Sequence, residues 1–192
     1  MSLRNTIIYL IGIPAVGKYT VAREIARLTG AKVVDNQLVN TPVFSVIGYD
    51  GTDAFPFPAE AWTHIDVIRA EVLAVIRDLC PPDDSFVFTN VLENDASSRA
   101  LFATIEELAA QRSAAFYPVW LTCEAEELRE RKATPDRKVR LKDIDLSSIP
   151  RWLQEVEVLR VDHPNALTLD TTHRTPTGTA EAILQHIDVR ST

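Results

Sequence analysis

The stretch Gly12–Lys18, with the sequence Gly-Ile-Pro-Ala-Val-Gly-Lys, directly follows the apolar run Thr6–Ile11. Glycines at this spacing let backbone N–H groups turn toward phosphate oxygens, and a following helix aims its positive dipole end at the same place. Lys18 would add a mobile charge for the β- and γ-phosphates. The next position normally offers a hydroxyl to Mg²⁺, but here it is Tyr19, followed by Thr20. These residues predict a phosphate-binding loop (P-loop) that binds its metal indirectly.

The residues after this loop support that interpretation. Val21, Ile25 and Leu28 recur at helical spacing and the pattern ends at Gly30, so strand, loop and helix come in the order that a P-loop needs. The alternative is a loop that merely joins a strand to a helix and leaves Lys18 exposed. The glycine spacing, the lysine and the flanking elements together favour the phosphate site.

A second candidate is Asp35, the last residue of the run Ala31–Asp35. Ligands of a parallel sheet gather at the carboxyl ends of its strands, so this carboxylate is expected beside the P-loop. It could orient an acceptor hydroxyl and take its proton, or hold Mg²⁺ through water. Asp35 with Asn36 is also good capping chemistry for a helix, and the sequence favours neither role over the other.

The charge distribution narrows the class of partner. The chain carries 20 Lys and Arg against 27 Asp and Glu, a net charge of −7, which disfavours general nucleic-acid binding. From Arg129 to Lys142, however, seven basic residues stand against two acids. So confined a patch predicts a small polyanion as partner and a mobile lid at about residues 129–145, although a solvated charged helix is the alternative. The lid arginines that could bind phosphate oxygens are Arg131, Arg137 and Arg140.

The region expected to bind an acceptor molecule covers about residues 36–80. Arg69 lies on a helical pattern there and could hold an anionic acceptor, or it could be a surface residue. Aromatic residues at 49–58 could form a pocket wall, although core packing is their commoner role. Asn90, at the end of the third expected strand, could face the site or cap the next turn.

Several classes of protein are disfavoured. Cys80 and Cys123 have no metal-ligand spacing, and the four histidines form no metal-binding pair. No apolar run could span a bilayer and the start of the chain has no signal-peptide pattern, so we expect a cytoplasmic protein with no membrane partner. The Asn-Lys-x-Asp signature of GTPases and the Gly-x-Gly-x-x-Gly of dinucleotide binders are both absent. The oligomeric state stays open.

Apolar periodicity divides the chain into alternating strands and helices. Strands are expected at 6–11, 31–35, 85–92, 115–123 and 166–170, and helices at 20–28, 58–79, 96–112, 148–161 and 177–187, with a further helix rich in Glu and Arg after the fourth strand. Pro118 suits the fourth strand only near its start or at an edge. The alternation predicts an α/β fold of three layers: a five-stranded, mainly parallel sheet with helices on both faces, in one domain over residues 1–192.

The form Gly-x-Pro-x-x-Gly-Lys-x-Thr over Gly12–Thr20 resembles the P-loop of the small-molecule and nucleoside monophosphate kinases, with departures from adenylate kinase at Ala15 and Tyr19. The order of Asp35, Arg69 and the arginine-rich region is similar to that in shikimate and gluconate kinases. The resemblance implies a P-loop kinase-like fold. It also implies transfer of the γ-phosphoryl of ATP to a hydroxyl or phosphate on a small molecule, with ATP and Mg²⁺ as cofactors.

The resemblance further implies roles for individual residues. The catalytic residues would be Lys18, Asp35 and Arg137. The nucleotide-binding residues would be Gly12, Pro14, Ala15, Val16, Gly17, Lys18, Tyr19, Thr20, Arg131 and Arg140, with adenine near residues 171–176. The acceptor would contact Asp35, Arg69 and Asn90, and Mg²⁺ would be held, through water, by Thr20 and Asp35.

Two questions stay open at this level. Tyr19, and the pair Thr89-Asn90 where a Walker-B acid would stand, also fit a nucleotide-binding regulatory or interaction module that transfers no phosphate. The acceptor is not identified. Gln37 replaces the second acid of the Asp-x-Asp pair of shikimate kinases, and no Gly-Gly-Gly turn follows the third strand.

Overall fold

Strand β1 (Thr6–Ile11) is buried along its whole length, because it lies at the centre of a sheet that is covered on both faces. The computed structural model describes residues 3–190, in which five strands are ordered β2-β3-β1-β4-β5. The other strands are β2 (Lys32–Asp35), β3 (Phe86–Asn90), β4 (Ala115–Thr122) and β5 (Leu167–Asp170). The predicted five-stranded α/β fold is confirmed, and every strand pair is parallel.

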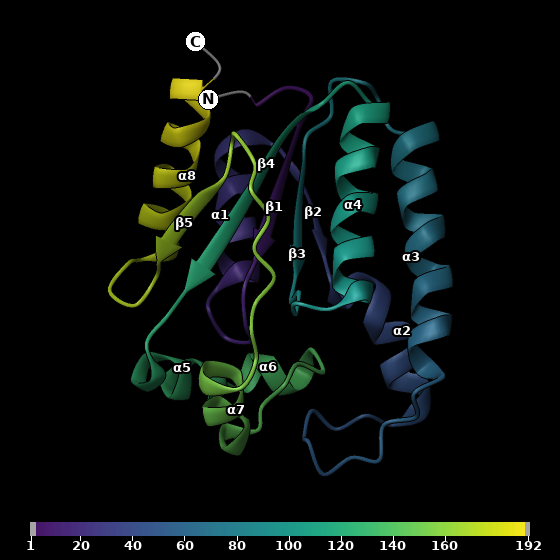
Figure 1. Cartoon of the computed structure of the whole chain (residues 1–192), viewed down its shortest axis with the longest axis vertical. Coiled ribbons are helices and arrows are strands. Elements are labelled where there is room, and N and C mark those ends of the chain that lie inside the picture. The colour runs from purple at the N-terminus through teal and green to yellow at the C-terminus, as the bar shows by residue number, and fades with distance from the viewer. Residues whose placement is uncertain (1–2, 191–192) are drawn as a thin grey trace.

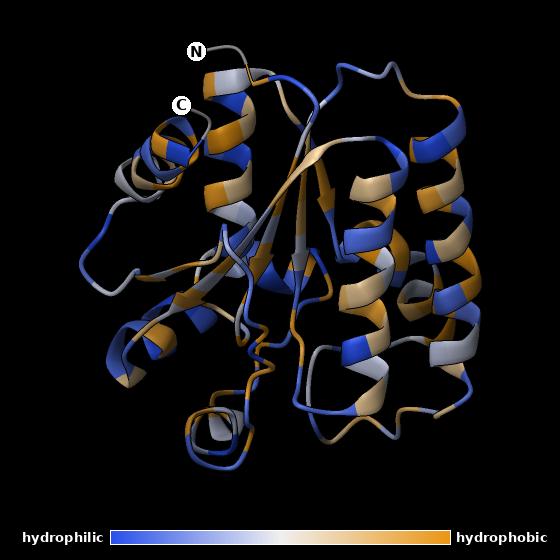
Figure 2. Ribbon diagram, turned by 45° about the horizontal axis from the view of Figure 1, so that its top comes forward, coloured by the Kyte–Doolittle hydropathy of each residue, from blue (hydrophilic) through white to orange (hydrophobic). Residues whose placement is uncertain are grey.

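Helices lie on both sides of the sheet (Figure 1). They are α1 (Lys18–Thr29), α2 (Gln37–Ile47), α3 (Ala61–Asp78), α4 (Ala96–Gln111), α5 (Ala125–Lys132), α6 (Pro135–Val139), α7 (Ile149–Gln154) and α8 (Pro176–Arg190), with a 3₁₀ turn η1 (Leu146–Ser148) before α7. Ile8 and Leu10 of β1 pack with α1 and α8. Tyr9 and Ile11 face the other way and pack with α3 and α4. Along α3 and α4 hydrophobic and hydrophilic residues alternate, as expected for helices with one face on the core (Figure 2).

Three elements differ from the sequence prediction, of which the short helix α6 is an addition within the basic stretch. Helix α2 was not predicted, and it contains Pro42, which local rules place outside helices. The helix predicted over 148–161 is wrong beyond α7, which ends at Gln154. The chain is extended beyond it, because the Leu159 amide donates to Leu92 O at 2.9 Å and the Asn94 amide to Glu157 O at 2.8 Å. This long-range pairing outweighs the local helical pattern.

Pro118 lies inside β4 and is accommodated by the order of the strands. The pairing of β4 with β5 begins only at Val119. Before that point the β5 side of β4 is an edge, where the Asn165 side chain donates to Phe116 O at 3.0 Å. A residue without an N–H group is tolerated at such an edge. No helix within residues 3–190 is long and apolar enough to cross a membrane.

The close packing of Gly12 against β4 generates a first prediction. A Cβ on Gly12 would lie 2.5 Å from the carbonyl oxygen of Leu121, a backbone atom that the sheet holds in place. We expect Gly12→Ala to lower the free energy of unfolding by about 2–3 kcal/mol, the upper part of the range for overpacked sites, because the clash is with backbone.

Gly30→Ala is the matched control, because a Cβ there meets nothing within 4 Å. It carries only the cost of a left-handed backbone, about 1 kcal/mol. Urea denaturation of both variants measures the difference. Equal losses, or a larger loss in Gly30→Ala, would contradict the packing argument.

Candidate functional site

The P-loop residues form a tight turn between β1 and α1. Ala15 and Gly17 have a left-handed backbone, with φ of 73° and 95°, which for alanine costs about 1 kcal/mol. Lys18 folds back over the turn, and its Nζ donates to the carbonyl oxygens of Gly12, at 2.6 Å, and Ile13, at 2.9 Å. The ammonium group is therefore held at the loop by neutral acceptors.

A cavity of about 1600 Å³ opens over this loop. Its walls come from the ends of β2 and β3, the chain between α2 and α3, residues 131–143 and the loop after β5. The predicted site residues that it brings together are Pro14, Ala15, Val16, Gly17, Lys18, Tyr19, Thr20, Asp35, Arg69, Asn90, Arg131 and Arg137. Gly12 packs against Leu121 instead, and Arg140 lines a smaller groove that Tyr19 and Asp35 separate from the cavity.

Asp35 is buried at the carboxyl end of β2. Thr89 on β3 donates its hydroxyl to Oδ1 at 2.6 Å, and Arg140 donates to Oδ2 at 2.9 Å. The Nζ of Lys142 lies 3.5 Å from the same Oδ2. Capping of α2 does not describe this carboxylate, since the cap position is Asn36 and no side chain caps it. Asp35 instead joins the sheet to the basic segment.

Asn90 and Arg69 reach the cavity from β3 and α3. Oδ1 of the buried Asn90 accepts from the Tyr9 hydroxyl at 3.2 Å, and its Nδ2 donates to Asn36 Oδ1 at 2.8 Å. Burial raises the pKa of the Tyr9 phenol well above its ordinary value, so the phenol remains a hydrogen-bond donor. Arg69 pairs with Asp66 one turn away on α3.

Arg131 connects three parts of the site. Its Nε donates to Glu127 at 2.7 Å, and its terminal nitrogens donate to the hydroxyl and carbonyl oxygens of Thr171, at 3.0 and 2.7 Å. The Thr171 hydroxyl also donates to the Val16 carbonyl oxygen at 2.9 Å. Arg131 therefore links α5 to the P-loop and to the loop after β5, where adenine is predicted.

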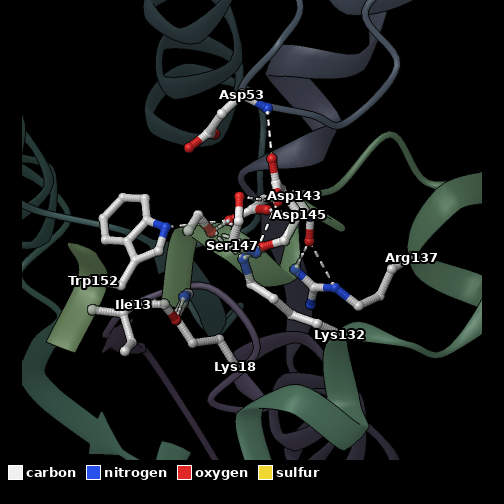
Figure 3. Close-up of polar contacts among 10 residues, drawn as sticks. Ile13, Lys18, Asp53, Lys132, Arg137, Asp143, Asp145, Ser147 and Trp152 are labelled. Atoms are coloured by element: carbon white, nitrogen blue, oxygen red, sulfur yellow. Dashed lines mark hydrogen bonds and ion pairs between the residues drawn. The ribbon is translucent and has the colours of Figure 1, made fainter. Parts of the chain in front are cut away.

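Lys132 forms a buried ion pair beside the cavity (Figure 3). Its Nζ lies 2.6 Å from Asp143 Oδ2 and donates to the Asp145 carbonyl oxygen at 2.7 Å, while the indole of Trp152 donates to Asp143 at 3.2 Å. Arg137 donates twice to the Asp143 backbone carbonyl, at 3.0 and 2.6 Å. Asp143 thus neutralises Lys132, whereas the carbonyl orients Arg137 and leaves its charge in place.

Cations crowd the P-loop end of the cavity. Burial, and then the nearby charges of Lys142 and Arg137, lower the pKa of Lys18 to about 7, against the opposing effect of Asp35. Burial also lowers the pKa values of Lys142 and Arg137. Lys18 and Lys142 share the carboxylate of Asp35, which cannot offset both charges, so the arrangement favours binding of a polyanion.

The sequence did not single out Lys142 or the partners of Tyr19, and it placed Thr171 only within the predicted adenine loop, without its contacts to Arg131 and Val16. Lys142 counted in the basic patch, but arginines were preferred there because a guanidinium binds phosphate in two places. The Tyr19 ring lies against two cations. The guanidinium carbon of Arg140 is 3.6 Å from the ring centroid, and Nζ of Lys142 is 4.5 Å from the same centroid. The sequence marked Tyr19 as an unusual residue at its position, but only the fold brings Arg140 and Lys142 to its ring.

The residues that surround the P-loop do not form a fixed Mg²⁺ site. The Thr20 hydroxyl donates back to Gly17 O at 2.8 Å, and Asp35 is shared by two cations. Within the described part of the chain, no group of three His, Cys, Asp or Glu side chains could hold a metal ion. Water-mediated ligation by Thr20 and Asp35 stays a prediction, and no step below passes through the metal.

No protein-family model matches the chain, and no curated protein matches it in sequence. Solved structures match its fold. A thymidylate kinase from Candida albicans has a TM-score of 0.63 and 18% identity, covering 100% of this chain and 94% of that chain. A gluconokinase from Sinorhizobium meliloti has a TM-score of 0.62 and 14% identity, covering 99% and 95%. An APS kinase from Mycobacterium tuberculosis, solved in complex with AMPPNP and APS, has a TM-score of 0.59 and 15% identity, covering 96% and 98%. The chain therefore has the P-loop kinase-like fold that its sequence resemblance implies.

The lowered pKa of Lys18 predicts a pH dependence of stability. The unfolded chain keeps the Lys18 proton up to an ordinary pKa of 10.5, whereas the folded protein releases it above about 7. Between these values the unfolded state binds more protons, so the free energy of unfolding should rise with pH.

Denaturation at a series of pH values between these limits measures this rise. We expect Lys18→Met to reduce the rise of the free energy of unfolding with pH, because this variant lacks the titrating ammonium group. The matched control Lys138→Met removes an exposed lysine of α6 and should leave the pH dependence of the free energy of unfolding unchanged. An unaltered slope in Lys18→Met would show that the pKa of Lys18 is not lowered by folding.

Proposed function

We propose that the chain is an ATP-dependent phosphotransferase that moves the γ-phosphoryl of ATP to a hydroxyl or phosphate on a small molecule. The observation that carries this proposal is a P-loop that shares one cavity with Asp35 and with the cations Arg131, Arg137 and Lys142. Phosphoryl transfer depends mainly on positioning and on positive groups around the charge of the transferred group. The kinases with the same fold, one of them solved with AMPPNP, support the same class of reaction.

Each residue would have a distinct task. The P-loop amides and Lys18, released from the loop carbonyls, would bind the β- and γ-phosphates. Arg131 and Arg137 would contact the phosphoryl group as its charge shifts in the transition state. Asp35 would accept a hydrogen bond from the acceptor hydroxyl and so orient it for attack.

The acceptor would lie in the half of the cavity that residues 36–80 form. Aromatic rings pack together there, with the Phe44 centroid 4.7 Å from that of Tyr49 and the Phe57 centroid 5.2 Å from that of Trp62. Arg69 lines the same half and would bind an anionic group. These walls support a small acceptor that combines an apolar or ring face with a negative charge.

The remaining sequence expectations belong to this proposal. They are a single domain over 1–192, a lid at about 129–145, adenine at 171–176, a cytoplasmic location, and a small-molecule partner in place of nucleic acid or membrane. The net charge of −7 supports the choice of partner. Mg²⁺ would enter as part of the nucleotide substrate.

A nucleotide-binding regulatory module is the second candidate. It is favoured by Tyr19, which removes the metal-ligating hydroxyl. It is disfavoured by a cavity of about 1600 Å³ that extends beyond the P-loop to Trp62 and Arg69. Such a module would bind nucleotide tightly and change its affinity for a partner without consuming ATP.

A panel of small metabolites scored by ATP consumption tests the two candidates. For an accepted metabolite we expect Lys18→Ala and Asp35→Asn each to lower kcat/KM by at least about a hundredfold, since each removes a group from the reacting centre. Lys138→Met is the control that should keep the wild-type rate. Unchanged transfer in Lys18→Ala contradicts the proposal, and tight nucleotide binding with no transfer to any metabolite favours the regulatory module.

A further inference from the structure

Tyr19 occupies the position at which a P-loop normally presents a Ser or Thr hydroxyl to Mg²⁺. In the structure its ring instead contacts cations. The guanidinium carbon of Arg140 lies 3.6 Å, and the ammonium of Lys142 4.5 Å, from the ring centroid. Both distances are well inside the range of cation–π attraction, which is strongest where water is excluded. The Tyr19 ring therefore binds positive side chains, and its phenol is not a compact ligand for a metal ion.

Asp35 holds the same two cations from another direction. Its Oδ2 lies 2.9 Å from Arg140 and 3.5 Å from Lys142. The buried Nε of Arg140 has no hydrogen-bond partner within the described residues. This arrangement fixes the guanidinium through its contacts with the ring and the carboxylate.

The two cations point to different places. Lys142 lines the large cavity together with Lys18, and its side chain is 17% exposed. Arg140 lines the smaller groove behind Tyr19 and Asp35. Arg140 therefore anchors the segment from outside, and Lys142 is the group that a ligand in the cavity would meet.

We propose that Tyr19 and Asp35 position the Lys142 ammonium as a fixed phosphate-binding charge, which takes over a task that other P-loops assign to protein-bound Mg²⁺. The inference rests on the proposed nucleotide binding at this loop. Its consequence is specific: the affinity of this chain for ATP depends little on Mg²⁺. Tyr19 is a positioning residue in this scheme, and Lys142 contacts the nucleotide.

The competing explanation is structural. The contacts of Lys142 with Asp35 and Tyr19 would then serve only to fasten residues 137–142 to the end of β2. Removal of Lys142 would in that case lower the stability of the fold and leave the metal dependence of nucleotide binding as it was. The metal dependence is therefore the measurement that separates the two explanations.

The experiment is calorimetric titration of the whole chain with ATP, once with excess Mg²⁺ and once in EDTA. The variants are Tyr19→Phe, Tyr19→Ser and Lys142→Met, with Lys138→Met as the exposed control from the same segment. For wild type, Tyr19→Phe and Lys138→Met we expect the two dissociation constants to agree within about threefold. Lys142→Met and Tyr19→Ser should weaken binding in EDTA by about tenfold or more, the usual effect of losing a hydrogen bond from a charged group, and binding with Mg²⁺ less.

Each result supports or overturns the inference. Equal weakening in both conditions in Lys142→Met, or loss in Tyr19→Phe equal to that in Tyr19→Ser, overturns it. A wild-type chain that binds ATP only with Mg²⁺ also overturns it and leaves the proposed function standing. No ATP binding in either condition overturns both. Tyr19 is only half-buried, so Tyr19→Ser tests the inference even where Lys142→Met fails to fold, and circular dichroism checks the fold of each variant.

Discussion

Mutual repulsion of cations is the constraint on which the rest of this site depends. Four positive side chains reach one end of a cavity, and flexible side chains would move apart unless something held them. Loop carbonyls bind Lys18, and the Asp143 carbonyl binds Arg137. The ring of Tyr19 lies against Lys142. Carbonyl groups and rings orient a cation without cancelling its charge, and the carboxylates present, Asp35 near Lys142 and Glu127 on Arg131, are fewer than the cations. The site is therefore ordered and still carries a positive surplus.

Lys132 shows what the opposite arrangement achieves. It comes from the same basic stretch, but the Asp143 carboxylate neutralises it inside the protein. Its task is to hold the chain around Asp145, whose Oδ2 accepts from the backbone amide of Asp53 at 3.3 Å and so connects the basic stretch to the acceptor half of the cavity. One short run of sequence thus supplies both a structural cation and cations that remain available to a ligand.

Much of this arrangement could be predicted from local pattern, because the parallel sheet makes each strand apolar and brings the strand ends together. That is why the P-loop and Asp35 were placed at one edge correctly. Helix α2 was missed since Pro42 contradicts local propensity, and the helix beyond Gln154 was overpredicted since its residues pair with a distant segment. The partners of Tyr19 depend on a contact between distant parts of the chain, which periodicity does not describe.

The pairing of Lys132 with Asp143 also limits the reach and the conformational entropy of the chain between them. It closes residues 132–143 into a loop whose ends are 11 positions apart and fixed to the body of the protein. Because both ends are tethered, no part of that loop can travel farther than about 18 Å, half its contour length. Closure has already removed much of the entropy that an open arm of the same length would lose on contact with a ligand. Arg137, which lines the cavity, is therefore carried on a short tether, which keeps its effective concentration at the cavity high.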